Sequence, residues 1–172
     1  MTRMSTRGKD HLDGIVAQWR REQPDLNVIA LGQLGRLLRA ADLADAVLTE
    51  GLAGLGLQPG WFDLLAALRR AGPRYELNPT QLMRTTMLTS GGITKRLDRL
   101  VEADLVERRP DPNDRRGTLV RLTRRGRSTI DRALDVHVTN EERLLGSLTP
   151  AERRALDGLL RSFLAGLEAA SP

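Results

Sequence analysis

The stretch from Thr89 to Arg127 constrains the fold more than any other part of the chain, because two different periodicities meet inside it. In its first half, apolar residues recur at the spacing of a helix with one buried stripe. These residues are Ile93, Leu97, Leu100, Val101 and Leu105. The spacing predicts a helix from Thr89 to about Ala103, with Thr89 as its N-cap.

The second half of this stretch has the pattern of a β-hairpin. Apolar and charged residues alternate from Val106 to Arg109, and a turn rich in Pro, Asp, Asn and Gly follows. An extended pattern resumes at Leu119 and continues to Leu122. Two alternating segments joined by such a turn predict a hairpin, here with a long and basic tip.

A short helix is predicted immediately before this stretch. Asn78-Pro79-Thr80-Gln81 has the residues of a capping box with proline at the first helical position, and the helix should end by about Arg84. Two helices joined by a tight turn, the second followed by a basic hairpin, form a winged helix-turn-helix, which binds DNA. The fold class that we expect is therefore mainly α (α+β): a winged helix-turn-helix with N- and C-terminal dimerisation helices.

The positive charge of the chain is concentrated on the same segment. Residues 84–127 contain 12 basic and 6 acidic residues, whereas the rest of the chain contains 15 basic and 16 acidic residues. A solvated basic face is the ordinary explanation of such an excess. Because the charge coincides with the motif, we interpret it as the docking surface for double-stranded DNA.

Several classes of protein are disfavoured by what the sequence lacks. It contains no cysteine, which removes disulfides, thiol nucleophiles and sulfur-ligated metals. It contains no Gly-rich phosphate loop and no Ser/His/Asp order, so we expect neither an enzyme nor a cofactor. No apolar run approaches the roughly 18 residues of a membrane helix, and no hydrophobic signal core follows the basic N-terminus. We therefore expect a cytoplasmic protein with no membrane partner.

The remaining helical patterns flank the predicted DNA-binding core. We expect a disordered tail (1–9), N-terminal helices comprising an extra first helix and a dimerisation helix (10–56), the winged helix-turn-helix (57–127) and C-terminal dimerisation helices (128–172). Thr123 is the expected N-cap of a helix that starts at Arg124, and Thr149-Pro150-Ala151-Glu152 has the residues of a capping box before the last helix. The terminal helices have wide apolar stripes. Core packing within one subunit would explain the stripes, but a homodimer is the interpretation that we favour, since two-fold symmetry also matches a palindromic operator.

The side chains that would read DNA follow from the same pattern. The face of the predicted recognition helix opposite its apolar stripe carries residues for base edges, with one arginine further along for a phosphate. The tip of the hairpin carries two arginines suited to a narrow minor groove, with an aspartate that could orient the second of them. In chain order, these residues are Ser90, Gly91, Thr94, Lys95, Arg99, Asp114, Arg115 and Arg116.

The segments I-T-K-R-L-D-R-L and L-V-E-R-R-P-D-P-N-D-R-R-G-T-L-V-R-L-T resemble the recognition helix and wing of the MarR family of bacterial transcriptional regulators. The resemblance covers essentially the whole chain. It implies a mostly helical winged-helix homodimer that releases DNA when a small, often phenolic or aromatic, ligand binds, with repression as the usual sign of regulation. It also implies that Asp114 braces Arg116, which enters the minor groove.

Arg96 is unusual because it falls on the apolar stripe of the predicted recognition helix. A buried arginine without a partner costs several kcal/mol, so we expect an acidic partner, and Asp63 in the apolar run W-F-D-L-L-A-A-L is the candidate. The pair could be a sensing element that an anionic ligand disrupts. Alternatively, the two residues form a static brace, or the Arg96 side chain reaches solvent, and in either case Arg96 has a structural role only.

The segment H-L-D-G-I-V-A-Q-W-R-R-E-Q-P-D-L resembles the extra first helix of the urate-responsive PecS/HucR-like branch of the same family. That resemblance implies a urate or similar small aromatic anion as effector, with Trp19, Asp63 and Arg96 as its ligand-binding residues. Trp19 as an ordinary core residue is the alternative, and we expect that role for Trp61.

Two other functions remain open. Asp10-His11-Leu12-Asp13 could hold a metal ion in a metal-responsive regulator, although one histidine and two carboxylates beside a tail are usually solvated, and we expect no metal site. A nucleoid-type protein could use the same winged helix without sequence preference. The preference for a specific operator over random DNA at one salt concentration separates that protein from a regulator.

Overall fold

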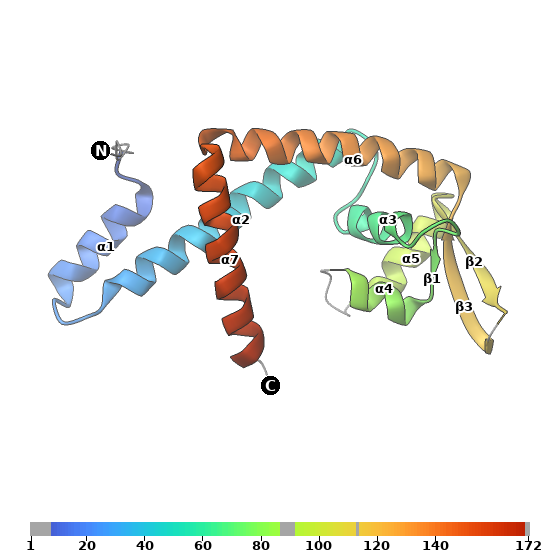
Figure 1. The fold of residues 1–172 in the computed structure, drawn as a ribbon, viewed down its shortest axis with the longest axis horizontal. Helices are drawn as coiled ribbons and strands as arrows, with labels where there is room; N and C mark the ends of the chain where they lie inside the picture. The colour runs from blue at the N-terminus through green and yellow to red at the C-terminus, as the bar shows by residue number, and fades with distance from the viewer. Residues whose placement is uncertain (1–7, 87–91, 113, 171–172) are drawn as a thin grey trace. The chain divides into compact units, whose positions relative to one another are not determined.

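The computed structural model describes residues 8–86, 92–112 and 114–170 of the chain (Figure 1). Within β3, the side chains of Arg115 and Arg116 also lie outside the described part. The chain divides into two compact units, Met1–Val47 and Leu48–Pro172. The long helix α2 (Val28–Ala53) contains the boundary between them.

The first unit consists of α1 (His11–Glu22) and most of α2. Asp10 caps α1, and its side chain and that of Asp13 form a reciprocal capping box. The guanidinium of Arg36 on α2 donates to Asp10 (2.7 Å) and to Asp13 (2.7 Å), which ties the two helices together. The hydrogen bond from Arg36 lowers the pKa of Asp10 below its ordinary value.

The second unit has the winged helix-turn-helix topology. Its sheet is antiparallel with strand order β1-β3-β2, and the β2–β3 hairpin is the predicted wing (Figure 1). Its elements are α3 (Trp61–Arg70), β1 (Glu76–Leu77), α4 (Pro79–Thr85), α5 (Ile93–Glu102), β2 (Val106–Asp111), β3 (Asp114–Leu122), α6 (Arg124–Leu144), η1 (Leu145–Ser147) and α7 (Pro150–Ala170). The expected α+β fold class is confirmed.

The core of the second unit joins the helix-turn-helix to the wing. Side chains from α3, α4, α5, both hairpin strands and α6 are fully buried in it. The largest are Leu64, Leu65, Leu68, Leu82, Leu100, Val106, Val120 and Ile130. Trp61 is also buried, as expected from its sequence context.

Local capping signals begin the helices where the sequence predicts. Asn78 and Gln81 form the expected capping box of α4, with hydrogen bonds of 2.8 and 3.0 Å. Thr123 caps α6 through a hydrogen bond from the Gly126 amide (2.8 Å). Thr149 and Glu152 form the same type of cap at the start of α7.

Two features differ from the sequence prediction. The helix α5 begins at Ile93 rather than at Thr89, because Gly92 adopts a left-handed backbone with φ of 95° and is its N-cap. Thr89 itself lies outside the described residues. The short strand β1 was not predicted, because two residues give no periodicity, and it is defined by pairing with Val120 and Arg121 of the distant β3.

Within the described ranges, none of the helices has the length and apolar character needed to cross a membrane.

Candidate nucleic-acid interface

The helix α5 separates its core face from its polar face clearly. Ile93, Leu97 and Leu100 are buried against the core. The predicted contact residues Thr94, Lys95 and Arg99 are exposed on the rest of its surface. The structure therefore presents these three side chains to solvent, as a recognition helix requires. Ser90 and Gly91, predicted for the same face, lie outside the described residues.

The start of α5 depends on Gly92. Its left-handed backbone is a conformation that side chains other than glycine rarely adopt. A Cβ atom at this position would also lie 3.3 Å from Nη1 of Arg96. The guanidinium of Arg96 therefore folds back toward the first turn of its own helix.

The wing is attached to α5 by an ion pair. Nη2 of Arg108 on β2 lies 2.7 Å from Oδ1 of Asp98 on α5, and both side chains are about half exposed. An exposed pair contributes only about 0–1 kcal/mol to stability. Its effect is therefore mainly geometric: it adds a polar contact between the hairpin and the recognition helix, whose relative position is set by the core that they share.

The tip of the wing is tightly packed. Asp111 pairs with Asp114 across the turn, and a Cβ atom on Gly117 would lie 3.0 and 2.9 Å from the Cβ atoms of these two aspartates. Only glycine fits there without displacement. Asp114, predicted as the brace, is exposed at the start of β3. Arg115 and Arg116 follow it in the strand, and their side chains are outside the described part.

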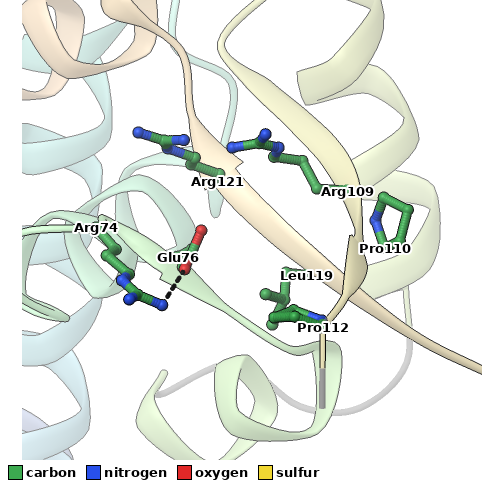
Figure 2. Close-up of a pocket in the computed structure, with 7 residues that line it drawn as sticks. All are labelled: Arg74, Glu76, Arg109, Pro110, Pro112, Leu119 and Arg121. Carbon is green, nitrogen blue, oxygen red and sulfur yellow. Dashed lines mark ion pairs between the residues drawn. The ribbon is translucent and has the colours of Figure 1, made fainter. Parts of the chain in front are cut away.

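The outer face of the wing sheet carries a basic hollow that the sequence prediction did not identify (Figure 2). The hollow has a volume of about 580 Å³, and Arg74 at its edge lies 3.8 Å from Glu76. It is lined by Arg74, Glu76, Arg109, Pro110, Pro112, Leu119 and Arg121. The sequence could have indicated part of this hollow, because Leu119 and Arg121 are two residues apart in a strand and therefore lie on the face opposite the buried Val120.

The helix α6 is fixed to α3 around one aromatic ring. Tyr75 has a left-handed backbone with φ of 53°, and its ring is contacted by the guanidinium groups of Arg69 (5.1 Å from the ring centroid) and Arg127 (4.6 Å). Arg69 also donates to Asp131 of α6 at 2.6 Å. These contacts hold the base of the wing, where β3 passes into α6.

The predicted effector residues are divided between the two units. Trp19 on α1 is 40% exposed, so it is not a core residue of the first unit. Asp63 on α3 and Arg96 on α5 are both half-buried in the second unit. The ion pairs found among the described residues do not include the expected Asp63–Arg96 pair, because the Arg96 guanidinium lies beside Gly92 instead.

The segment Asp10–Asp13, considered above as a possible metal site, has a different role in the structure. The carboxylates of Asp10 and Asp13 both accept hydrogen bonds from Arg36 and therefore neutralise a cation of the chain itself. No cluster of three or more potential metal ligands occurs in the part of the chain that the structure describes.

Comparison with known proteins gives a consistent result. Residues 55–117 match a model described as the MarR family. The HTH-type transcriptional regulator PecS of Dickeya dadantii (strain 3937) is 38% identical over 146 residues, which cover 85% of this chain and 88% of PecS. A structure of a mutant MarR from Escherichia coli complexed with operator DNA aligns with a TM-score of 0.70 and 32% identity, covering 81% of this chain and 99% of that one. A structure of Bordetella bronchiseptica BpsR, on the regulation of DNA binding by 6-hydroxynicotinic acid, aligns with a TM-score of 0.69 and 28% identity, covering 80% and 95%.

Proposed function

Because the chain belongs to the MarR family of transcriptional regulators, we propose that it is a ligand-responsive repressor that binds a palindromic operator as a homodimer. Its curated relatives are regulators, and the chain is not an enzyme. A repressor of this kind acts in the cytoplasm. The observation that carries the proposal is the exposed polar face of α5 joined to a basic hairpin by the Arg108–Asp98 ion pair.

In this proposal the two parts of the motif contact different grooves. Ser90, Gly91, Thr94 and Lys95 enter the major groove, and Arg99 contacts a phosphate. Arg115 and Arg116 reach the adjacent minor groove, where Asp114 orients Arg116. The support is the exposure of the three described residues of α5 and the excess of positive charge on this segment.

Replacing Arg116 with alanine should weaken operator binding and reduce the slope of log affinity against log salt concentration by about one ion. The physical reason is the loss of one guanidinium that displaces a counterion from the DNA. Fluorescence anisotropy with a labelled operator over a salt series measures both quantities. Arg154→Ala, which removes an exposed arginine from α7, is the matched control and should change neither. If Arg116→Ala and Arg154→Ala have the same slope and affinity, Arg116 does not contact DNA.

We further propose that a small aromatic anion, urate or a similar molecule, releases the DNA. A planar anion is recognised by an aromatic face, a hydrogen-bond acceptor and a guanidinium, and Trp19, Asp63 and Arg96 supply these groups. The proposal is supported by similarity to PecS and by the half-buried positions of Asp63 and Arg96.

Operator binding with and without a panel of purines and aromatic acids tests this function. Urate should lower the affinity for the operator and change tryptophan fluorescence, and Asp63→Asn or Arg96→Gln should abolish both responses while the free protein still binds DNA. If saturating urate alters neither signal, urate is not the effector. A response to another acid, such as 6-hydroxynicotinate, would identify a different effector of the same class.

Two alternative functions are separated by simple measurements. A nucleoid-type protein would bind its upstream sequence and random competitor DNA with equal affinity at one salt concentration, whereas a regulator prefers the operator by about 10³-fold or more. A metal-responsive regulator would bind a transition metal when purified in its presence. The hydrogen bonds from Arg36 to Asp10 and Asp13 oppose that function.

A further inference from the structure

The basic hollow on the outer face of the wing sheet takes no part in the contacts proposed above for α5 and the hairpin tip (Figure 2). Arg121 points to this face because it alternates along β3 with Val120 and Leu122, which are buried in the core shared with α5. The hollow therefore lies on the side of the sheet that faces away from the recognition helix. A partner bound there is separate from the bases that α5 reads.

Three guanidinium groups line the hollow, and they belong to the loop before β1, to β2 and to β3. Arg109 of β2 pairs with Leu119 of β3, so Arg121 is its diagonal neighbour on the same face, with about 7–8 Å between the Cα atoms. Figure 2 shows the side chain of Arg109 extended toward that of Arg121. Two like charges in this arrangement repel each other, and an anion that contacts both removes the repulsion.

The neighbouring carboxylates compensate this charge only weakly. Nε of Arg109 lies 4.0 Å from Oε1 of Glu107. Nη1 of Arg74 lies 3.8 Å from Oε1 of Glu76, which is also long for an ion pair. In the described part of the chain, Arg121 belongs to none of the ion pairs. Three cations beside two carboxylates therefore leave a positive excess that an outside anion can bind.

The exposure of these arginines favours a polyanion over a small free ion. The side chains of Arg74 and Arg109 are 80% and 51% exposed, so their attraction for a single ion is screened by water and salt. Arg109 is two residues from Asp111 at the turn of the hairpin, a distance of about 7 Å along β2. A duplex that is held by the hairpin tip therefore keeps its phosphates beside the hollow at a high effective concentration.

We propose that the basic hollow binds the phosphate backbone of double-stranded DNA beyond the operator, on the outer side of the minor groove that the hairpin tip reaches. This interaction rests on the proposed function, because the tip must hold the duplex for the hollow to reach it. Contacts to phosphates carry no sequence information. The flanking DNA therefore adds affinity that depends on its length and on the salt concentration, but not on its base sequence.

Two duplexes that carry the same operator test this site by fluorescence anisotropy over a salt series. One ends at the operator boundary, and the other carries one further helical turn of random sequence, about 10 bp, on each side. The unmodified protein should bind the extended duplex about tenfold more tightly. Arg109→Gln with Arg121→Gln should remove this gain and reduce the salt slope on the extended duplex by about one ion for each arginine in each subunit. On the operator-only duplex, the double variant should bind within about twofold of the unmodified protein, because screening limits the reach of the replaced charges.

Arg143→Gln with Arg154→Gln is the matched control. It removes the same charge from exposed positions of α6 and α7 that do not line the hollow, so the gain from the flanks should be retained. Arg109→Lys with Arg121→Lys keeps the charge and should also retain most of the gain. Equal affinities of the unmodified protein for the two duplexes would show that the hollow does not bind DNA, as would equal losses in the two glutamine double variants.

An acidic protein segment is the other partner that the charge of the hollow fits, and poly-L-glutamate is its probe. If poly-L-glutamate binds the unmodified protein but not Arg109→Gln with Arg121→Gln, and the flanks have no effect, the partner is a protein and the DNA interaction is wrong. The operator-only duplex reports on the proposed function by itself. Failure to prefer that duplex over random DNA of the same length would contradict the proposed function, whereas a missing gain from the flanks alone contradicts only the role of the hollow.

Discussion

Replacing Gly126 with alanine should destabilise the second unit by about 3 kcal/mol or more, the upper end of overpacking effects. Gly126 is buried in the first turn of α6, and a Cβ atom there would lie 2.8 Å from the carbonyl carbon of Leu105 and closer still to its oxygen. That carbonyl already accepts a hydrogen bond from the Thr123 amide (3.1 Å). The collision is with backbone, so no side-chain rotation can relieve it.

Urea denaturation followed by circular dichroism measures this loss. Gly158→Ala is the matched control, because Gly158 lies within α7 and has open space around its Cα atom. Alanine is favoured over glycine in a helix by about 1 kcal/mol, so the control should be neutral or slightly more stable. Equal midpoints for Gly126→Ala and the unmodified protein would show that α6 does not pack on the turn after α5.

Introducing two glutamates on α7, at Leu159 and Phe163, should produce a monomer that binds the operator about 10²-fold or more weakly. Leu159 is 71% exposed in the single chain, and other large apolar side chains on the same face of α7 are exposed as well. A continuous apolar face of this kind is typical of a subunit interface. A homodimer reads two half-sites at once, so its loss removes the gain from simultaneous binding.

Analytical ultracentrifugation and operator anisotropy on the same samples test this prediction. Leu159→Glu with Phe163→Glu lowers the net charge by two, and Arg154→Glu makes the same change on the opposite side of α7. Arg154→Glu should therefore remain dimeric, with at most a small loss of DNA affinity. A double variant that still sediments as a dimer would place the subunit interface elsewhere, for example along the exposed leucines of α2.

The fold could be predicted where the sequence signal is local. The capping boxes at Asn78 and Thr149 and the cap at Thr123 each involve residues three apart, and all of them begin helices in the structure. The hairpin was predicted for a similar reason, because its alternation and its turn are contiguous. The predicted start of α5 at Thr89 was wrong, because the apolar pattern does not reveal that the backbone of Gly92 is left-handed.

Features that depend on tertiary contacts could not be predicted. The strand β1 exists because it pairs with β3, and the basic hollow of the wing combines residues from β1, β2, β3 and the loop before β1. The Asp63–Arg96 ion pair was inferred from the positions of the two residues in apolar helical patterns, but the position of a guanidinium depends on its full surroundings. The predicted DNA contacts Thr94, Lys95 and Arg99 are exposed as required, and their roles on DNA remain predictions.

The ion pair between Arg108 and Asp98 has a consequence for the operator itself. In the proposed complex, the core shared by α5 and the hairpin, together with this ion pair, keeps the distance between the bases read by the helix and the groove reached by the hairpin constant. In this proposal, each half of the operator must therefore keep the bases read by α5 and the groove reached by the hairpin at one fixed separation. Inserting a single base pair between them would put one of the two out of reach, even if every recognised base were retained.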